Sequence, residues 1–196
     1  MLRTLPFTIL ACLLSACHPA GREQADNAGS RVDSILPMDV MLDRFRAGLD
    51  HPTHMASGMT NRDSLVAALI HALSTQDTAA FEPLTVTRAE WAWLYFPTDI
   101  LSRPPYELPP GLAWFQLQET NRKGALRLFR ELGGDTLTLD SYHCRPDPMV
   151  EDANRIWTGC LVTLHRNGGA AETIRLFSAI LERDGRYAFL SFDNDY

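Results

Sequence analysis

The sequence has no excess of basic residues. Its 196 residues include 18 Lys and Arg against 24 Asp and Glu, which gives a formal charge of −6. Binding to nucleic acid, or electrostatic adhesion to anionic lipid, needs clusters of Lys and Arg, so we expect neither. The chain also has no internal repeat and no low-complexity core segment. These absences predict one globular domain whose partners do not include nucleic acid.

The common catalytic and metal-binding motifs are missing as well. The chain contains no G-x-S-x-G nucleophile motif. The glycine pairs at 133–134 and 168–169 lack the strand-to-helix context and the spacing of a phosphate-binding loop. His51 and His54 lie in a Pro- and Gly-containing segment with no third ligand at a suitable spacing. We therefore expect no metal ion and no cofactor.

The N-terminal apolar run, residues 5–14, is too short to cross a bilayer as a helix, since it has only about ten residues. It follows Arg3 and leads directly into Leu14-Ser15-Ala16-Cys17. This arrangement resembles the signal sequence and lipobox of bacterial lipoprotein precursors. The resemblance implies removal of residues 1–16, a thioether-linked diacylglycerol on Cys17 and usually an added N-acyl chain. A plain secretory signal cut near Ala20 and an N-terminal core helix are the alternatives.

A lipobox also implies a location. Two or three acyl chains would anchor the protein stably, because each buried CH₂ contributes about 0.8 kcal/mol. In Gram-negative lipoproteins an Asp after the cysteine is the usual inner-membrane retention signal, and this chain has His18 there. The resemblance thus implies the periplasmic face of the outer membrane. Residues 17–33 read as a flexible tether without apolar periodicity, and 34–196 as a single domain.

Cysteine usage is consistent with an exported protein. Cys12 would leave with the signal peptide and Cys17 would be lipidated, so only Cys144 and Cys160 remain. In an oxidising compartment two remaining thiols favour one disulfide, which would stabilise the fold by about 3 kcal/mol. A tight turn near residue 150 would set the two cysteines about four residues out of register, whereas a long bent loop through 146–148 would bring them together. Two separate buried thiols are the alternative.

The order of the predicted elements indicates an α+β fold. Apolar spacing and capping residues predict helices over 40–46, 60–74, 77–81, 87–96 and 111–132. From residue 135 the period changes to two, which predicts strands over 136–139, 156–164, 174–181 and 187–192. Turn residues at 167–169 and 184–185 favour tight hairpins, so we expect the last three strands to form an antiparallel meander. Helices should then cover one face of a curved sheet of at least four strands.

Helices followed by a strand meander resemble the cone-shaped fold of the nuclear transport factor 2-like, or SnoaL-like, superfamily, over roughly residues 60–196. The resemblance rests on element order alone. Some members of that superfamily are isomerases, dehydratases or cyclases that use an Asp, His or Tyr inside the cone. Many others bind ligands or partners without catalysis, so the resemblance does not decide the function.

Strand alternation from residue 137 gives the enzymatic candidates. It places Asp140, Tyr142 and Cys144 on one face of the strand, and Leu137, Leu139, Ser141 and His143 on the other. If the second set faces inward, His143 could act as a general acid or base, and an inward Asp140 would be the other enzyme-like case. A hydrogen-bonded rim histidine and a surface carboxylate are the structural alternatives.

Aromatic residues give the binding candidates. Trp91, Trp93 and Tyr95 lie within five residues, and Trp114 follows close behind. They could line a hydrophobic pocket for an apolar ligand, with packing in the core as the alternative. The sequence therefore favours a membrane-anchored, non-enzymatic domain that binds a small apolar molecule or an envelope protein. A cone-fold enzyme using His143 or Asp140 is the second hypothesis, and a structural lipoprotein that pairs through a strand edge is the third.

Overall fold

The computed structural model describes residues 36–196. The predicted signal peptide, the lipidation site Cys17 and the tether lie outside the described residues. No helix in the described part of the chain is long and apolar enough to cross a membrane. The described residues form one compact unit, Leu36–Tyr196.

Helical elements fill the first two thirds of this unit. They are α1 (Met38–Arg46), α2 (Arg62–Ser74), α3 (Thr78–Phe81), η1 (Glu82–Leu84), α4 (Arg88–Glu90), the π-helical turn η2 (Trp91–Tyr95), η3 (Phe96–Thr98), η4 (Ile100–Ser102) and α5 (Pro110–Leu132). Asn61, one residue after the predicted start, caps α2, because its side chain accepts a hydrogen bond from the Ser64 backbone N–H at 2.8 Å. The predicted capping box of Thr87 and Glu90 is present.

Seven strands follow, and all of their pairings are antiparallel. They are β1 (Leu137–His143), β2 (Met149–Glu151), β3 (Asn154–Thr158), β4 (Leu161–Arg166), β5 (Ala171–Ile174), β6 (Ala179–Arg183) and β7 (Arg186–Ser191). They form one sheet in the order β1-β4-β5 and another in the order β2-β3-β6-β7. The predicted α+β class and the expectation of at least four strands are confirmed.

The two predicted hairpin turns are also confirmed. Asn167 and Gly168 connect β4 to β5 with φ angles of 54° and 71°, and Asp184 and Gly185 connect β6 to β7 with 52° and 74°. Left-handed backbone of this kind favours Asn, Asp and Gly, so these four residues specify both turns.

The predicted antiparallel meander of the last three strands is confirmed, but two of these strands are interrupted. The predicted strand 156–164 is two strands separated by Gly159, whose φ is +63°, and the predicted strand 174–181 is likewise split into β5 and β6. Because β3 pairs with β6 while β4 pairs with β5, both segments pass from one sheet to the other. Apolar and β-branched composition indicates extended chain but does not show where a strand breaks.

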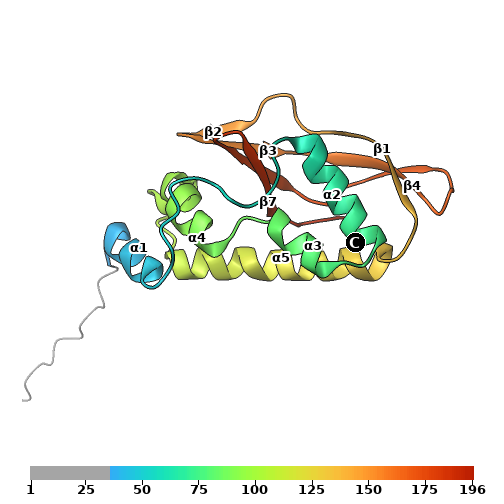
Figure 1. Ribbon diagram of the computed structural model, residues 1–196. Coiled ribbons are helices and arrows are strands. Elements are labelled where there is room, and N and C mark those ends of the chain that lie inside the picture. The colour runs from blue at the N-terminus through green and yellow to red at the C-terminus, as the bar shows by residue number, and fades with distance from the viewer. Residues whose placement is uncertain (1–35) are drawn as a thin grey trace, which may run out of the picture. The chain divides into compact units, whose positions relative to one another are not determined.

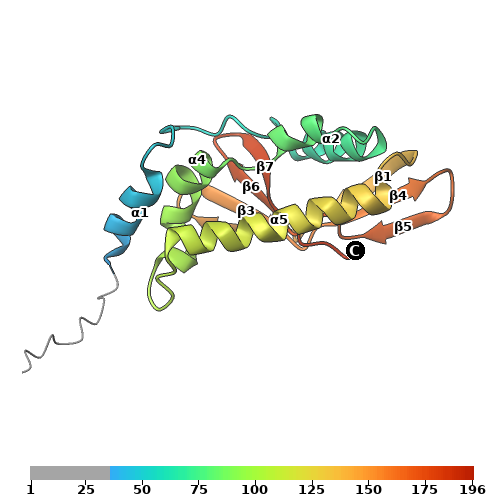
Figure 2. The ribbon, with the colours of Figure 1, turned by 90° about the horizontal axis from the view of Figure 1, so that it is seen from below.

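Two buried clusters form the core, and α5 contributes to both of them. The first contains residues of α2, the C-terminal half of α5 and β4, with Ile180 and Phe189. The second contains residues of α1, η2 and the start of α5, with Leu181 and Ala188 on the opposite face of β6 and β7. Figure 2 shows α5 running from the end of the domain that holds α1 and α4 to the end that holds β4 and β5. Side chains on both faces of the sheet β2-β3-β6-β7 are therefore buried, and Figure 1 shows α5 running beneath the strands.

The middle of α5 lies directly on the segment that follows β7. Asn121 donates to the carbonyl of Leu190 at 3.0 Å and accepts from the Phe192 N–H at 2.9 Å. A side chain at Gly124 would meet the carbonyl oxygen of Phe192 at 1.9 Å. Gly124 is therefore required by close approach of two backbones.

Candidate functional site

An apolar hollow of about 220 Å³ lies where η2 and η3 pack against α5 and β7. We call it the aromatic pocket; its lining residues are Trp91, Tyr95, Phe96, Asp99, Leu101, Ala113, Leu117, Leu190 and Ser191. Mostly hydrophobic walls with a few polar groups are typical of small-molecule sites. A cavity of about 150 Å³ lined by aliphatic and aromatic residues is large enough to bind benzene. The aromatic pocket is therefore large enough for a ligand of roughly one substituted ring.

A buried carboxylate fixes the backbone on which the pocket aromatics stand. Glu90 is 2% exposed. Its oxygens accept hydrogen bonds from the backbone N–H groups of Ala56 at 2.6 Å, Ser57 at 2.8 Å and Thr87 at 2.9 Å, and from the Thr87 hydroxyl at 2.9 Å. Burial alone would raise the pKa of Glu90, but the hydrogen bonds from Ser57, Thr87 and Ala56 outweigh it and hold the pKa below its ordinary value. The π-helical turn that follows is thus attached to the loop at residues 56–57.

The structure separates the four predicted aromatic residues. Trp91 is 2% exposed, and its ring centroid lies 5.4 Å from that of Trp114 and 4.4 Å from that of Phe96. Trp91 and Tyr95 line the aromatic pocket, whereas Trp114 packs behind Trp91. Trp93 belongs to another contact, because it stacks on the His51 ring at 3.7 Å.

Three of the residues that line the aromatic pocket, Tyr95, Asp99 and Ser191, are polar. The Asp99 carboxylate accepts a hydrogen bond from the Leu101 N–H at 2.7 Å. Burial, and then the charge of Asp99, raise the pKa of Tyr95 far above its ordinary value, so this phenol stays neutral. Burial, followed by the same charge, also raises the pKa of Glu151. Tyr95, Asp99 and Ser191 thus give an otherwise apolar pocket a few polar atoms.

The sequence candidates did not include three apolar residues that line the aromatic pocket: Ala113, Leu117 and Leu190. Ala113 and Leu117 are four residues apart on α5, which is the spacing of one helix face. Leu190 lies on β7, two residues from the strand's apolar Ala188. Periodicity marks all three as inward-facing, but nothing in the sequence distinguishes a residue beside a hollow from one in close packing.

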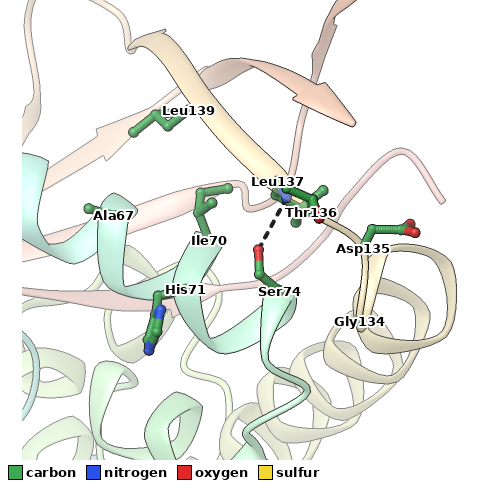
Figure 3. Close-up of a pocket in the computed structure, with 9 residues that line it drawn as sticks. All are labelled: Ala67, Ile70, His71, Ser74, Gly134, Asp135, Thr136, Leu137 and Leu139. Carbon is green, nitrogen blue, oxygen red and sulfur yellow. Dashed lines mark hydrogen bonds between the residues drawn. The ribbon is translucent and has the colours of Figure 1, made fainter. Parts of the chain in front are cut away.

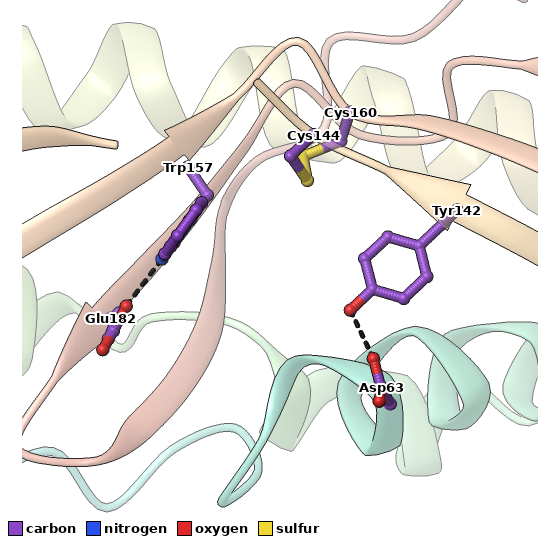
Figure 4. The surroundings of a disulfide bond; sticks show 6 residues. All are labelled: Asp63, Tyr142, Cys144, Trp157, Cys160 and Glu182. Atoms are coloured by element: carbon purple, nitrogen blue, oxygen red, sulfur yellow. Dashed lines mark hydrogen bonds between the residues drawn. A yellow bond between two sulfur atoms is a disulfide. The ribbon is translucent and has the colours of Figure 1, made fainter. Parts of the chain in front are cut away.

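A second hollow, of about 380 Å³, lies beside the disulfide. We call it the polar hollow; its lining residues are Arg62, Asp63, Tyr142, His143, Cys144, Arg145, Pro146 and Trp157. Figure 4 shows Tyr142 pointing at Asp63 and Trp157 pointing at Glu182. The Tyr142 hydroxyl donates to Asp63 and the Trp157 ring N–H donates to Glu182, both at 2.7 Å. Most of the polar side chains seen here are thus already paired.

The predicted faces of β1 are wrong beyond residue 139. The β1–β4 register pairs Leu139 with Leu164 and Ser141 with Thr163, so Asp140 is the extra residue of a β-bulge. The bulge reverses the alternation. Leu137 and Leu139 before it, and Tyr142 and Cys144 after it, pack on the first core cluster. Consequently His143 and Asp140 are both exposed, and only His143 reaches the polar hollow.

The predicted disulfide between Cys144 and Cys160 is confirmed. Their Cα atoms lie 3.9 Å apart. His143 pairs with Leu161 in the ladder of β1 and β4, so the two cysteines are the next pair beyond it. The intervening chain forms the β2–β3 hairpin, which returns the second cysteine to its partner. The turn falls between Glu151 and Asn154, so neither predicted loop geometry is needed.

A third hollow, of about 390 Å³, lies between the end of α2 and the start of β1 (Figure 3). Its polar groups have structural roles. The Leu137 N–H donates to the Ser74 hydroxyl at 3.4 Å. Asp135 accepts from Asn167 at 2.8 Å and from Arg166 at 2.5 Å, and these bonds, the one from Asn167 first, hold the pKa of Asp135 below its ordinary value. His71 also lines this hollow, but Asp135 and Ser74, its other polar side chains with hydrogen bonds, connect α2 and α5 to the strands.

Among residues 36–196 there is no group of three or more His, Cys, Asp or Glu side chains arranged to hold a metal ion. His51 stacks on Trp93 and His54 lies 3.2 Å from the Thr53 hydroxyl. No family model matches the chain, and no curated protein or solved structure matches it. The function therefore has to be inferred from the sequence of this chain and from the geometry of residues 36–196.

Proposed function

We propose that this protein is a lipid-anchored envelope protein that binds a small, mostly apolar molecule in the aromatic pocket. The anchor would be acylated Cys17, on the periplasmic face of the outer membrane. The lipobox residues 14–17 support this location. The disulfide between Cys144 and Cys160 is consistent with it, because such bonds persist in oxidising compartments.

The observation that carries the binding proposal is the combination of size and lining in the aromatic pocket. About 220 Å³ of space is bounded by Trp91, Leu117 and Leu190, and Asp99 is among the lining residues. A ring with one hydroxyl or similar donor matches this lining. The ring would pack against the apolar side chains, and the donor could form a hydrogen bond with Asp99 or Ser191. Ligands with a large charged group are disfavoured, since burying an unpaired charge is costly.

Titration with p-cresol and toluene tests this proposal. Either compound should change the tryptophan fluorescence in a saturable way, because Trp91 forms one wall of the pocket. Replacing Ala113 by Leu fills the pocket and should remove the change. Ala125→Leu, on the same helix but outside the pocket, is the matched control and should bind like the natural protein. Unchanged binding by Ala113→Leu would refute the assignment of the site.

The anchor has its own test. Expressed in a bacterial host, the protein should float with membranes, and its mass should correspond to residues 17–196 plus acyl chains. Cys17→Ala should remain at full length and carry no lipid. An unmodified Cys17 in the natural sequence would contradict the proposed location while leaving the pocket untouched.

We also propose that the domain is cone-like, in the manner of the nuclear transport factor 2-like superfamily. Two observations support this: helices precede the strands, and β3–β4 and β5–β6 each pass from one sheet to the other. Acid/base catalysis is less well supported. His143 lines the polar hollow but exposed Asp140 does not, so these two candidates do not converge on one site.

A further inference from the structure

One end of the domain carries several large apolar side chains on its surface. Ile100, Leu101, Tyr106, Leu112 and Phe115 are all exposed, and all lie between η4 and the second turn of α5. We call them the apolar end. The loop that carries three of them folds back on itself, since the Leu108 N–H donates to the Leu101 carbonyl at 2.8 Å. Figure 2 shows this loop projecting at the end of the domain that holds α1. Large exposed apolar side chains that follow one another closely along the chain make this end a candidate interaction surface.

The chain enters the described domain at the same end. Leu36, its first residue, borders a shallow hollow together with Pro109, Pro110 and Gly111 at the start of α5. Phe115 lies one helical turn beyond Gly111. The 19 residues from Cys17 to Leu36 span at most about 65 Å whatever their conformation. A lipid on Cys17 would therefore hold this end within reach of the bilayer.

Charges around the apolar end are balanced. Arg44, Arg88 and Arg103 are exposed there, and so are Asp39, Asp43 and Glu107. Such a surface has little electrostatic attraction for anionic lipid, which needs an excess of basic residues. Leu, Ile, Phe and Tyr side chains, in contrast, favour the boundary between lipid headgroups and acyl chains.

We propose that the apolar end rests on the same bilayer that holds the acyl chains of Cys17, with Ile100, Tyr106, Leu112 and Phe115 in the interface; this inference depends on the lipid anchor proposed above. Leu101 belongs both to the apolar end and to the lining of the aromatic pocket. The contact would therefore set one wall of that pocket against the membrane, which is a source of small apolar molecules.

The chain offers a matched pair of positions for the test. Phe115 and Leu126 are both on α5 and are 59% and 58% exposed, but only Phe115 belongs to the apolar end. The processed, lipidated protein would have no free thiol, because Cys144 and Cys160 are bonded and Cys17 is acylated. Phe115→Cys and Leu126→Cys can therefore each be labelled with the polarity-sensitive dye NBD, and the proteins reconstituted into phosphatidylethanolamine–phosphatidylglycerol vesicles.

The expected result is a blue shift and a severalfold rise of NBD emission at position 115 on reconstitution, with position 126 unchanged and no effect of high salt. Flotation and intact mass of the same samples report the anchor. A floating protein whose position 115 stays in a water-like environment overturns the inference and leaves the anchor intact. A protein that carries no lipid and does not float overturns both. A change at position 115 that appears in detergent and depends on protein concentration assigns the surface to a second copy and also overturns the inference.

Discussion

The two halves of α5 pack into cores of different kinds. The C-terminal half meets regular elements, α2 and the strands of the β1-β4-β5 sheet, and Leu128 and Leu132 there are fully buried. The N-terminal half meets short turns of different helical types, stacked aromatic rings and the buried carboxylate of Glu90. The regular half is closed by a disulfide, whereas the irregular half encloses the aromatic pocket. The regular half has hollows of its own, of about 380 and 390 Å³, so the irregular half differs in the stacked aromatic rings around its space.

The largest effect should come from the irregular half. Glu90→Ala leaves the N–H groups of Ala56, Ser57 and Thr87 without their acceptor in a buried position. Each unsatisfied buried donor costs roughly 1 to 3 kcal/mol, so we expect a loss of about 4 kcal/mol in the free energy of unfolding, measured by urea denaturation. Glu82→Ala, at an exposed carboxylate, is the control and should change stability by less than about 0.5 kcal/mol. Equal effects of the two substitutions would show that Glu90 does not hold this region.

The pH dependence of stability sharpens the same point. The pKa of Glu90 is lowered in the folded protein, so its stabilising contribution is present above the ordinary value of 4.5 and is lost as the pH falls through the lower folded value. The stability difference between the natural protein and Glu90→Gln should therefore be largest at neutral pH and shrink below pH 4.5. A difference that stays constant from pH 7 to pH 3 would contradict this assignment.

The disulfide tests the regular half. Replacing Cys144 and Cys160 by Ala opens a loop whose ends are 16 residues apart. The chain-entropy model gives a loss of about 3 kcal/mol. Urea denaturation of the double variant should match that of the reduced natural protein. Binding of p-cresol should persist, because the aromatic pocket lies in the other half of the domain.

Two glycines of α5 have different surroundings: Gly124 is closely packed, whereas Gly111 has open space around it. Gly124→Ala forces a methyl group onto the Phe192 carbonyl, so we expect a loss of about 2 kcal/mol. At Gly111 the nearest atom to an added Cβ is the Phe45 ring, at 4.0 Å. Gly111→Ala should therefore be neutral or stabilise the protein by up to about 1 kcal/mol, because alanine restricts the unfolded chain. Thermal denaturation of both variants measures the contrast, and a loss at both positions would remove it.

The smallest effect on stability is expected inside the aromatic pocket. Ala113→Leu adds its side chain where space exists, so the free energy of unfolding should change by less than about 1 kcal/mol while ligand binding is lost. A loss as large as that of Gly124→Ala would mean that the pocket is packed as closely as the regular half.

Each half could be predicted in part from the sequence. Capping residues and apolar spacing gave α2 and α5, and Asn-Gly and Asp-Gly gave the two hairpins. The bulge at Asp140 and the break at Gly159 were missed, because each depends on the partner strand rather than on local composition. The sequence grouped Trp91, Trp93 and Tyr95 as pocket candidates, whereas in the structure Trp93 stacks on His51 and only the other two line the aromatic pocket. A hollow is the space that side chains from separate elements leave between them, so no local pattern encodes it.

The most direct test of the proposed binding site is a crystal structure of the protein soaked with p-cresol. The account predicts one ordered ring between Trp91, Leu117 and Leu190, with its hydroxyl toward Asp99 or Ser191. A ring bound in the polar hollow, or an aromatic pocket that stays empty at saturating p-cresol, would contradict the account.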